Sequence, residues 1–231
     1  MRWQRAVVIG ASGGIGAAVA SALEKGGCEV IALGRSERGA AYLDLEQEDT
    51  IAAAAEHAAA RGAPDLVFVA TGLLHGGDVA PEKDWRDLDA ASMARNFKVN
   101  SIGPTLVAKH FLPLLPVERT ACFAALSARV GSISDNRLGG WYSYRASKAA
   151  LNMLVRTLSV ELKRKNPSAV CVGLHPGTVD TPLSEPFQRN VPEGKLFTPE
   201  YSAAKLLGVL ARLECRDSGK LFAWDGQEIA P

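Results

Sequence analysis

The sequence predicts an α/β fold, with a doubly wound parallel sheet of about seven strands flanked by helices. Short apolar runs rich in Val, Ile and Leu alternate with longer segments of helical pattern along the 231 residues. The apolar runs are continuous rather than interrupted by polar residues, which is typical of parallel strands buried on both faces. A chain of this length is expected to form one domain, residues 1–231.

We expect strands in the seven apolar runs at 6–10, 29–33, 41–44, 65–70, 120–126, 169–174 and 220–224. Helices are expected at 14–25, 48–61, 90–115, 143–164 and 199–213. The second helix is rich in alanine, the best helix former, and Thr50 stands near its start. The fourth ends at the basic run Lys163-Arg164-Lys165, where positive charge complements the helix dipole.

Residues 176–199 form the least regular segment of the chain and are rich in proline. A structureless connection of this length is unusual in a compact domain, and such segments are more often lids or substrate loops. We therefore expect a substrate loop here, with a solvated connector as the alternative.

The charge balance excludes several classes of partner. Lys and Arg number 26 against 25 Asp and Glu, giving a formal net charge of +1. Proteins that bind a nucleic-acid backbone or an anionic membrane surface need a concentrated basic excess. With 47% apolar and 22% charged residues the chain is also an ordinary globular one. We expect a small-molecule partner, no nucleic acid and no membrane.

The cysteines and histidines predict neither a disulfide framework nor a metal site. The four cysteines are widely spaced, no C-x-x-C occurs and the histidines do not cluster. Three histidines, His57, His75 and His110, are expected at the surface or in caps, while His175 precedes Pro176 and is expected to border the active site. No stretch approaches the roughly 20 apolar residues that span a bilayer, so we expect a cytoplasmic protein.

A glycine-rich turn follows the first predicted strand and leads into the first helix. Its residues are Gly10, Ala11, Ser12, Gly13, Gly14, Ile15 and Gly16. Glycines there allow a tight turn and a close approach to a pyrophosphate, and the helix N-terminus offers free N–H groups to the anion. We interpret the turn as a dinucleotide-binding site; a plain tight turn is the alternative.

The end of the second strand indicates which dinucleotide is bound. A site for NAD(H) usually carries an acidic side chain here for the ribose 2′-hydroxyl, whereas this chain has Gly34 and Arg35. A guanidinium suits a 2′-phosphate, so the sequence favours NADP(H) over NAD(H) unless Arg35 is simply solvated. Asp44 could accept a hydrogen bond from the adenine amino group or serve as a turn residue.

Tyr144 and Lys148 are candidates for proton transfer. They lie four residues apart and share one face of the fourth predicted helix. A phenol ordinarily titrates near 10, and a nearby ammonium favours the phenolate, so Lys148 could bring Tyr144 into a useful range. A helix can also carry such a pair by chance.

The order of these motifs resembles that of the short-chain dehydrogenase/reductase (SDR) family over essentially the whole chain. It comprises the glycine-rich turn, Asn100, Ser127 at a strand end, Tyr144 with Lys148, and Pro176-Gly177-Thr178 after a later strand. Residues 131–140 and the run Trp224-Asp225-Gly226 resemble the C-factor and sniffer-type carbonyl reductase branch.

The resemblance implies a Rossmann fold and a set of roles. Tyr144 would be the general acid in carbonyl reduction and the base in alcohol oxidation, and Lys148 would lower its pKa and hold the nicotinamide ribose. Asn100 would fix a kink in its helix and hold a water that resupplies protons, and Ser127 would be the catalytic serine. The implied cofactor-binding residues are Gly10, Ser12, Gly13, Gly14, Ile15, Gly16, Arg35, Asp44, Leu45, Ala70, Thr71, Gly72, Tyr144, Lys148, Pro176, Gly177, Thr178 and Val179.

Two positions depart from the family pattern. Ala128 stands where the family usually has the substrate-polarising serine, three residues before Gly131, so either Ser127 or Ser132 must replace it. Adjacent strand residues face opposite ways, so Ser127 serves only if the strand end twists or bulges. The run Ala70-Thr71-Gly72 replaces the family's Asn-Ala-Gly.

These features predict an NADP(H)-dependent oxidoreductase acting on a carbonyl or alcohol substrate. The pocket is expected from residues 73–79, 132–142 and 181–197, with Trp141, Phe187 and Phe197 favouring an apolar or aromatic carbonyl. A dinucleotide-binding regulatory or signalling protein with little turnover, as in C-factor, is the alternative that Ala128 favours. The resemblance makes a homo-oligomer through the helices after Asn96 and Ser143 possible and leaves the substrate and the assembly open.

Overall fold

The computed structural model describes residues 2–231, apart from the side chain of Asn190. At its centre is a seven-stranded sheet in the order β2-β1-β3-β4-β5-β8-β9. The strands are β1 (Arg5–Ile9), β2 (Glu29–Leu33), β3 (Leu66–Val69), β4 (Ala121–Leu126), β5 (Ala169–His175), β8 (Leu221–Ala223) and β9 (Glu228–Ile229). All neighbours from β2 to β8 are parallel, and β9 is an antiparallel edge strand. The predicted α/β fold is confirmed.

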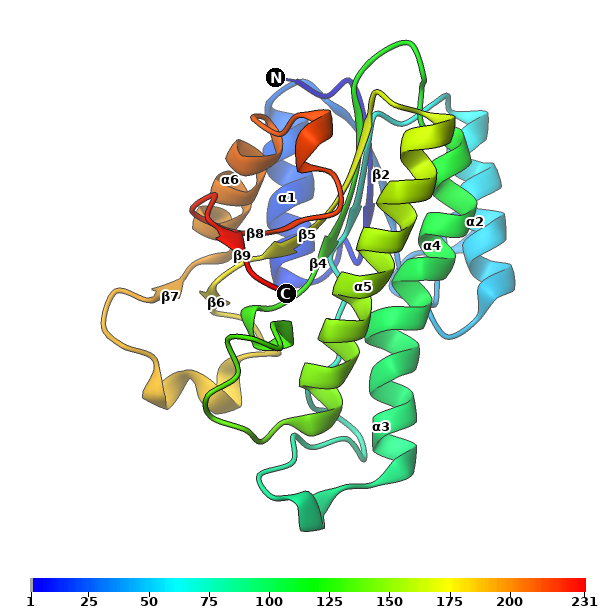
Figure 1. Ribbon diagram of the computed structural model, residues 1–231. Coiled ribbons are helices and arrows are strands. Elements are labelled where there is room, and N and C mark those ends of the chain that lie inside the picture. Colours follow the sequence, from blue (N-terminus) through cyan, green and yellow to red (C-terminus); the bar gives the residue numbers. More distant parts are fainter. Residues whose placement is uncertain (1) are drawn as a thin grey trace.

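Helices cover both faces of the sheet (Figure 1). On one face α1 (Gly14–Lys25) packs against α6 (Pro199–Leu210). On the other lie α2 (Glu48–Ala60), α4 (Gly103–Phe111) and α5 (Tyr142–Lys165). The molecule thus has three layers, and α3 (Ala90–Phe97) extends from α4 beyond the end of the sheet.

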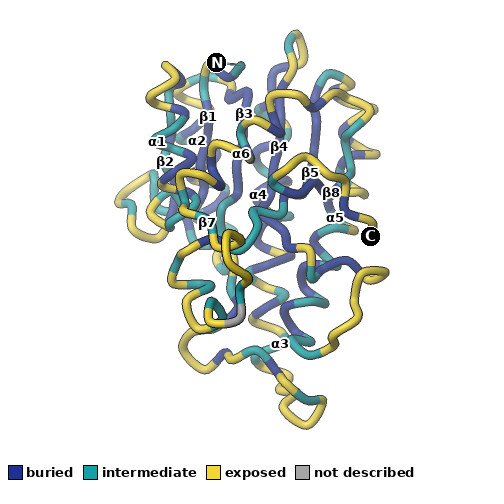
Figure 2. The backbone as a smooth tube through the Cα atoms, turned by 90° about the vertical axis from the view of Figure 1, so that its left-hand side faces the viewer, coloured by how far each residue is buried: buried dark blue, intermediate teal, exposed yellow. Residues whose placement is uncertain are grey.

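Two apolar cores explain why the strands read as continuous apolar runs. Val7 and Ile9 of β1 enter the core on the α2, α4 and α5 side, whereas Ala6 and Val8 enter the core under α1 and α6. Figure 2 shows the strands as the buried interior, with exposed residues concentrated in the loops. Because both faces of the sheet pack against apolar side chains, polar residues lie mainly at the strand ends, where a binding site can form.

The helix predicted at 90–115 is interrupted. A π-helical turn (Lys98–Ile102) separates α3 from α4, and a short 3-10 helix (Leu112–Leu114) follows α4. The π turn places Asn100 inside the protein, where its side chain bonds to neighbouring segments. These tertiary hydrogen bonds stabilise the π turn that interrupts the helix, and the helical sequence pattern does not reveal them.

The prediction of a strand at 41–44 is wrong. A 3-10 helix (Gly39–Ala41) takes its place, followed by a single bridge between Gly34 and Tyr42. The Asp44 N–H donates to the Thr50 hydroxyl at 3.0 Å instead of to a strand, so the chain turns into α2. The sheet still has seven strands because β9 adds one at the opposite edge.

The irregular segment predicted at 176–199 contains some regular structure. Two short strands, β6 (Thr178–Val179) and β7 (Leu196–Phe197), pair in parallel, and a 3-10 helix (Glu185–Asn190) lies between them. We call residues 178–197 the β6–β7 segment. It projects from the sheet beside the first turns of α5 (Figure 1).

Among residues 2–231 no helix is long and apolar enough to cross a membrane. Within the same residues, no group of three or more His, Cys, Asp or Glu side chains is arranged to hold a metal ion. All four cysteines are free thiols.

Candidate active site

A cleft of about 870 Å³ opens at the carboxyl edge of the sheet. Most of the predicted site residues line it, and they come from segments far apart in the chain: Gly10, Ser12, Gly13, Gly14, Ile15, Arg35, Leu45, Ala70, Thr71, Gly72, Ser127, Tyr144, Lys148 and Pro176. Gly16, Asp44, Asn100, Gly177, Thr178 and Val179 are not in its lining. The fold therefore brings the predicted phosphate turn and the predicted catalytic pair to one cleft.

The glycine-rich turn has a geometry that only glycine permits. Gly10 has a φ of +83°, and its carbonyl accepts a hydrogen bond from the Gly13 N–H at 3.0 Å. A Cβ on Gly16 would lie 2.1 Å from the same carbonyl oxygen, so the helix could not pack this close to the turn. α1 begins at Gly14 without a side-chain cap, which leaves its first N–H groups for an anion.

The cleft ends at the exposed side chain of Arg35, beyond β2. Next to it the Ser36 hydroxyl donates to the Ser12 hydroxyl at 3.1 Å, and both serines line the cleft. Ser36 was not predicted as a site residue; its position directly after Arg35 was the available signal. The Arg35 cation and the hydroxyls of Ser36 and Ser12 are groups suited to binding a phosphate.

Asp44 serves as a turn residue, the second of its two predicted roles. Its carboxylate accepts from the Glu46 N–H at 3.0 Å and from the Gln47 amide at 3.3 Å. The neighbouring Leu45, which is buried, lines the cleft in its place.

Tyr144 and Lys148 lie on one face of α5 and are 8% and 2% exposed. The Lys148 ammonium donates to the Leu126 carbonyl at 2.8 Å, and its Nζ is 5.8 Å from the centroid of the Tyr144 ring. Burial raises the pKa of Tyr144 to about 12 and lowers the pKa of Lys148 to about 7. In the free protein burial thus opposes the predicted phenolate–ammonium pair and keeps the phenol protonated at neutral pH.

Asn100 does not line the cleft but connects the segments that do. It is fully buried; its Nδ2 lies 2.8 Å from the Leu73 carbonyl and 3.1 Å from the Ser147 hydroxyl. Its Oδ1 accepts from the Leu73 N–H at 2.8 Å. The Ser147 hydroxyl in turn donates to the Tyr144 carbonyl at 2.8 Å. The kink at Asn100 therefore joins the loop after β3 to the turn of α5 that bears Tyr144.

The structure separates the two candidate serines. Ser127 lines the cleft, and its hydroxyl donates to Asn152 Oδ1 at 2.7 Å. Ser132 does not line the cleft, and its hydroxyl accepts from the Asp135 N–H at 3.2 Å within its own loop. Ala128 packs against Tyr144 in a small apolar cluster. The position beside Tyr144 thus carries a methyl group where the family has a hydroxyl.

An aromatic wall extends from Tyr144 towards the β6–β7 segment. The Trp141 ring lies 6.3 Å from Tyr144 and 4.9 Å from Phe187, and Phe187 lies 5.7 Å from His75. None of the three aromatic residues predicted in the pocket lines the cleft. Trp141 and Phe187 pack beside Tyr144, whereas Phe197 packs on Trp224 at 4.6 Å and on Tyr201 at 4.9 Å.

Trp141 holds a left-handed backbone conformation, with a φ of 51°. A bulky residue adopts this conformation only where its surroundings enforce it. The Trp141 N–H donates to the Glu82 carbonyl at 2.6 Å, and the buried Glu82 carboxylate accepts from the Ser143 N–H and hydroxyl. Glu82 therefore fixes the start of α5 directly before Tyr144.

Two buried polar atoms near the cleft lack hydrogen-bond partners in the described structure: Thr71 Oγ1 and His175 Nδ1. Thr71 lines the cleft, so its hydroxyl is available to a bound molecule. Burial lowers the pKa of His175 to about 4, with the Arg129 guanidinium acting in the same direction. His175 is therefore neutral at the cleft border, next to Pro176.

The segment from Pro176 to Val179 turns the chain out of β5. Gly177 has a φ of +78°, and a Cβ there would lie 2.6 Å from the Phe197 ring. Pro176 lines the cleft while Val179 is buried in β6. From there Thr181, Pro182 and Leu183 form the facing wall of the cleft.

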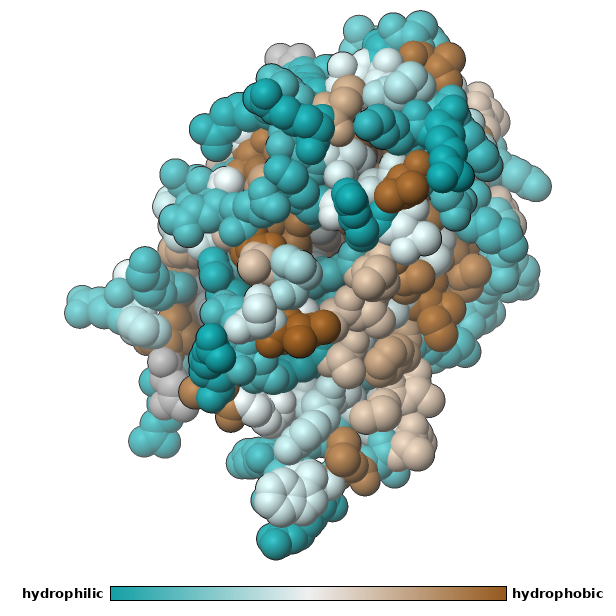
Figure 3. Space-filling model, in the orientation of Figure 1, coloured by the Kyte–Doolittle hydropathy of each residue, from teal (hydrophilic) through white to brown (hydrophobic). Residues whose placement is uncertain are grey.

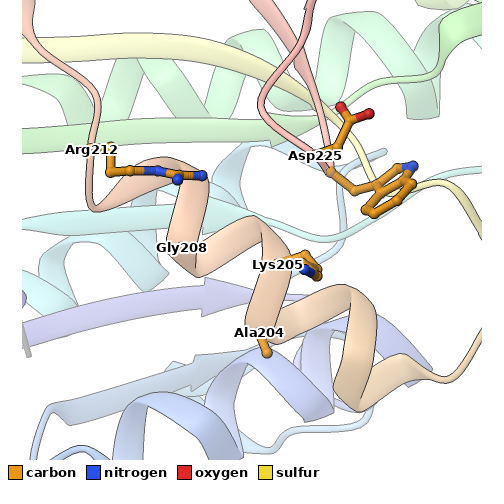
Figure 4. A pocket seen from close by; sticks show the side chains of 6 residues that line it. Ala204, Lys205, Gly208, Arg212 and Asp225 are labelled. Atoms are coloured by element: carbon orange, nitrogen blue, oxygen red, sulfur yellow. The ribbon is translucent and has the colours of Figure 1, made fainter.

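A smaller hollow of about 420 Å³ lies between α6 and the turn that joins β8 to β9 (Figure 4). Lys205 and Arg212 extend from either side of Gly208, and Asp225 stands on the facing turn. None of the predicted site residues lines this hollow. The candidate active site is therefore the larger cleft.

Hydrophobic residues gather on the face formed by α4 and α5 (Figure 3). Ile102, just before α4, and Met153 and Val160 on α5 are exposed by 48%, 65% and 43%. These are the helices through which the sequence predicts assembly.

The comparisons with known proteins agree with this architecture. The model of the short chain dehydrogenase family matches residues 4–192. C-signal of Myxococcus xanthus is 38% identical over 143 residues, covering 62% of this chain and 81% of that protein. A 1-hydroxy-2-glutathionyl-2-methyl-3-butene dehydrogenase of Rhodococcus sp. (strain AD45) is 31% identical over 230 residues, covering 95% and 96%.

Among solved structures, an NADPH-bound carbonyl reductase from chicken fatty liver superposes with a TM-score of 0.86 at 26% identity, covering 100% of this chain and 95% of that one. The chain therefore belongs to the short-chain dehydrogenase family, and the resemblance predicted from its motifs is confirmed. Its similarity to C-signal and to a carbonyl reductase also agrees with the predicted branch.

The depressed pKa of Lys148 predicts how stability depends on pH. Between about pH 7 and the ordinary lysine value of 10.5, the unfolded chain binds a proton that the folded chain does not. This group therefore makes the free energy of unfolding rise with pH in that window, by up to about 1.4 kcal/mol per pH unit. Urea unfolding without cofactor should show this rise in the wild type between about pH 7 and 8, and its loss in Lys148→Met. At higher pH the thiols of Cys28, Cys122 and Cys171, whose pKa values burial raises, act in the opposite direction. The exposed Lys163→Met is the control and should keep the rise; equal slopes in all three proteins would contradict the burial effect.

Proposed function

We propose that this protein is an NADP(H)-dependent oxidoreductase that reduces the carbonyl group of an aldehyde or ketone. One observation carries the proposal: a single cleft joins the anion-binding turn at the start of α1 to the buried Tyr144–Lys148 pair. The carbonyl reductase with the same fold is NADPH-bound, and the Rhodococcus relative is a dehydrogenase.

The residues present fit a nicotinamide dinucleotide. The free N–H groups at the start of α1 and the glycine turn suit its pyrophosphate, and the Thr71 hydroxyl has no other partner. Arg35, Ser36 and Ser12 would hold a 2′-phosphate, which favours NADP(H) over NAD(H). Leu45, Ala70 and Gly72 would lie along the cofactor, and residues 176–179 would border its nicotinamide.

The catalytic step uses the protonated phenol. A bound nicotinamide dinucleotide supplies the hydride to the carbonyl carbon. Tyr144 gives its proton to the carbonyl oxygen, so the product is the alcohol and Tyr144 is left as the phenolate. The acid form of Tyr144 is present at neutral pH, as it is for an ordinary phenol. Burial raises the pKa of Tyr144 to about 12 and so disfavours the phenolate that this step leaves behind. Lys148, with Nζ 5.8 Å from the Tyr144 ring centroid, stabilises the phenolate.

The substrate pocket favours an apolar carbonyl compound with a flat ring. Trp141 and Phe187 pack beside Tyr144, outside the lining of the cleft, and belong with Ala128 and Leu183 to one apolar cluster. Tyr144 and Leu183 are the members of this cluster that line the cleft. Flat rings pack well against such a cluster, edge-on or offset. Ser127 is the serine at the cleft, but polarising the substrate oxygen would require its hydroxyl to leave Asn152.

A regulatory or signalling protein that binds the dinucleotide with little turnover is the second candidate. The methyl group of Ala128 beside Tyr144 and the similarity to C-signal favour it. The intact, buried set of Asn100, Tyr144 and Lys148 favours the enzyme.

The Tyr144 proton is tested by Tyr144→Phe, which keeps the ring and removes the hydroxyl. We expect kcat/KM for carbonyl reduction to fall at least about 100-fold. Tyr142→Phe, two residues earlier and outside the cleft lining, should stay within about twofold of the wild type. NADPH oxidation across a panel of aromatic aldehydes and ketones measures both. Unchanged turnover in Tyr144→Phe would remove Tyr144 from the reaction.

The cofactor preference is tested by Arg35→Asp, which replaces the cation with a charge that repels a 2′-phosphate. The Kd for NADPH should rise about 10- to 100-fold, while the Kd for NADH should not rise. Arg38→Asp makes the same change on an exposed residue outside the cleft lining and should leave the preference intact. Fluorescence titration measures the NADPH and NADH affinities of the wild type and of both variants. Equal NADPH and NADH affinities in the wild type would contradict the proposed preference for NADP(H).

A further inference from the structure

His75 joins the two walls of the cleft. Its Nε2 lies 3.0 Å from the Pro182 carbonyl oxygen and 3.1 Å from the Leu183 carbonyl oxygen, 107 and 108 residues away in the chain. Both partners can only accept, so Nε2 carries the hydrogen and donates to the pair. All three residues line the cleft, so this contact crosses it from the loop after β3 to the β6–β7 segment.

The β6–β7 segment has few other polar ties to the protein. Its remaining hydrogen bonds near the cleft are internal, such as Ser184 N–H to the Thr181 carbonyl and the Gln188 amide to the Asp180 carboxylate. Among the hydrogen bonds described for residues 181–190, only those from His75 come from outside residues 178–197. The segment therefore holds its own shape and depends on His75 for its polar attachment across the cleft.

The His75 ring is placed by packing and by a tight turn. It meets Phe187 edge-on, with an interplanar angle of 71°. Directly after it, Gly76 and Gly77 adopt φ values of 126° and 60°, and Gly76 forms an antiparallel bridge with the buried Val79. Positive φ values at consecutive glycines allow the turn that presents the imidazole to the facing wall.

We propose that His75 is a positioning residue that latches the β6–β7 segment closed across the cleft. Breaking its hydrogen bonds releases the wall formed by Pro182 and Leu183, and the aromatic contact with Phe187 is released with it. A ligand in the cleft then exchanges only as fast as the latch opens. The identity of that ligand, a dinucleotide with a carbonyl substrate, rests on the proposed function; the latch itself does not.

Limited trypsin digestion without cofactor tests the latch independently of any activity. The exposed Arg189 and Lys195 place tryptic bonds inside the β6–β7 segment, and mass spectrometry identifies cleavage at each. His75→Phe keeps an aromatic ring for Phe187 and removes the donor, so cleavage there should become about 3- to 10-fold faster. His75→Gln offers a side-chain N–H in place of Nε2 and should stay within about twofold of the wild type. The matched control His57→Phe, on α2, should leave this cleavage unchanged.

Stopped-flow release of NADPH extends the test to the bound state. His75→Phe should release NADPH about 3- to 10-fold faster than the wild type, and His75→Gln should restore slow release. Wild-type cleavage in His75→Phe, or equal acceleration in the Phe and Gln variants, overturns the latch. If the wild type binds no NADPH, the proposed function fails while the proteolysis result still stands. Equal urea midpoints for the variants establish that the differences are local.

Discussion

The active-site geometry depends on the buried side chain of Asn100. Its amide bonds both the N–H and the carbonyl of Leu73, and through the Ser147 hydroxyl it reaches the backbone of Tyr144. A buried amide left without these partners would cost the protein about 1–3 kcal/mol. The π turn between α3 and α4 is the backbone conformation that delivers Asn100 to this position. One side chain thus connects the loop after β3 to the face of α5 that carries Tyr144 and Lys148.

Burial of Tyr144 and Lys148 sets their chemistry. The same loss of water raises the pKa of the phenol and lowers the pKa of the ammonium, so both groups favour their neutral forms in the free protein. This arrangement costs stability, since an exposed lysine would keep its charge and its solvation. Tyr144 lies in a small apolar cluster with Ala128, which stands where the resemblance predicts a substrate-polarising hydroxyl.

The sequence predicted the features that rest on local pattern or on motif order. Strand 29–33 and helix 14–25 match β2 and α1, and most predicted cofactor and catalytic residues meet at one cleft. The predictions that failed concern features that depend on contacts between residues far apart in the sequence. The strand at 41–44 failed because Asp44 turns into α2. Trp141, Phe187 and Phe197 do not line the cleft as predicted, because each packs on another aromatic ring. For His75 the sequence predicted only a surface or capping position, because no local pattern reveals a carbonyl partner 107 residues away.

The proposed reaction adds a hydride from a nicotinamide dinucleotide and a proton from Tyr144 to a carbonyl group. The most direct measurement is isotope transfer: an aromatic aldehyde is incubated with the protein and NADPH deuterated at the transferring position of C4, and the alcohol product is examined by mass spectrometry and NMR. We expect deuterium on the carbinol carbon of the product. Tight NADPH binding without deuterated alcohol from any carbonyl compound in a broad panel would contradict hydride transfer and identify a dinucleotide-binding protein without turnover.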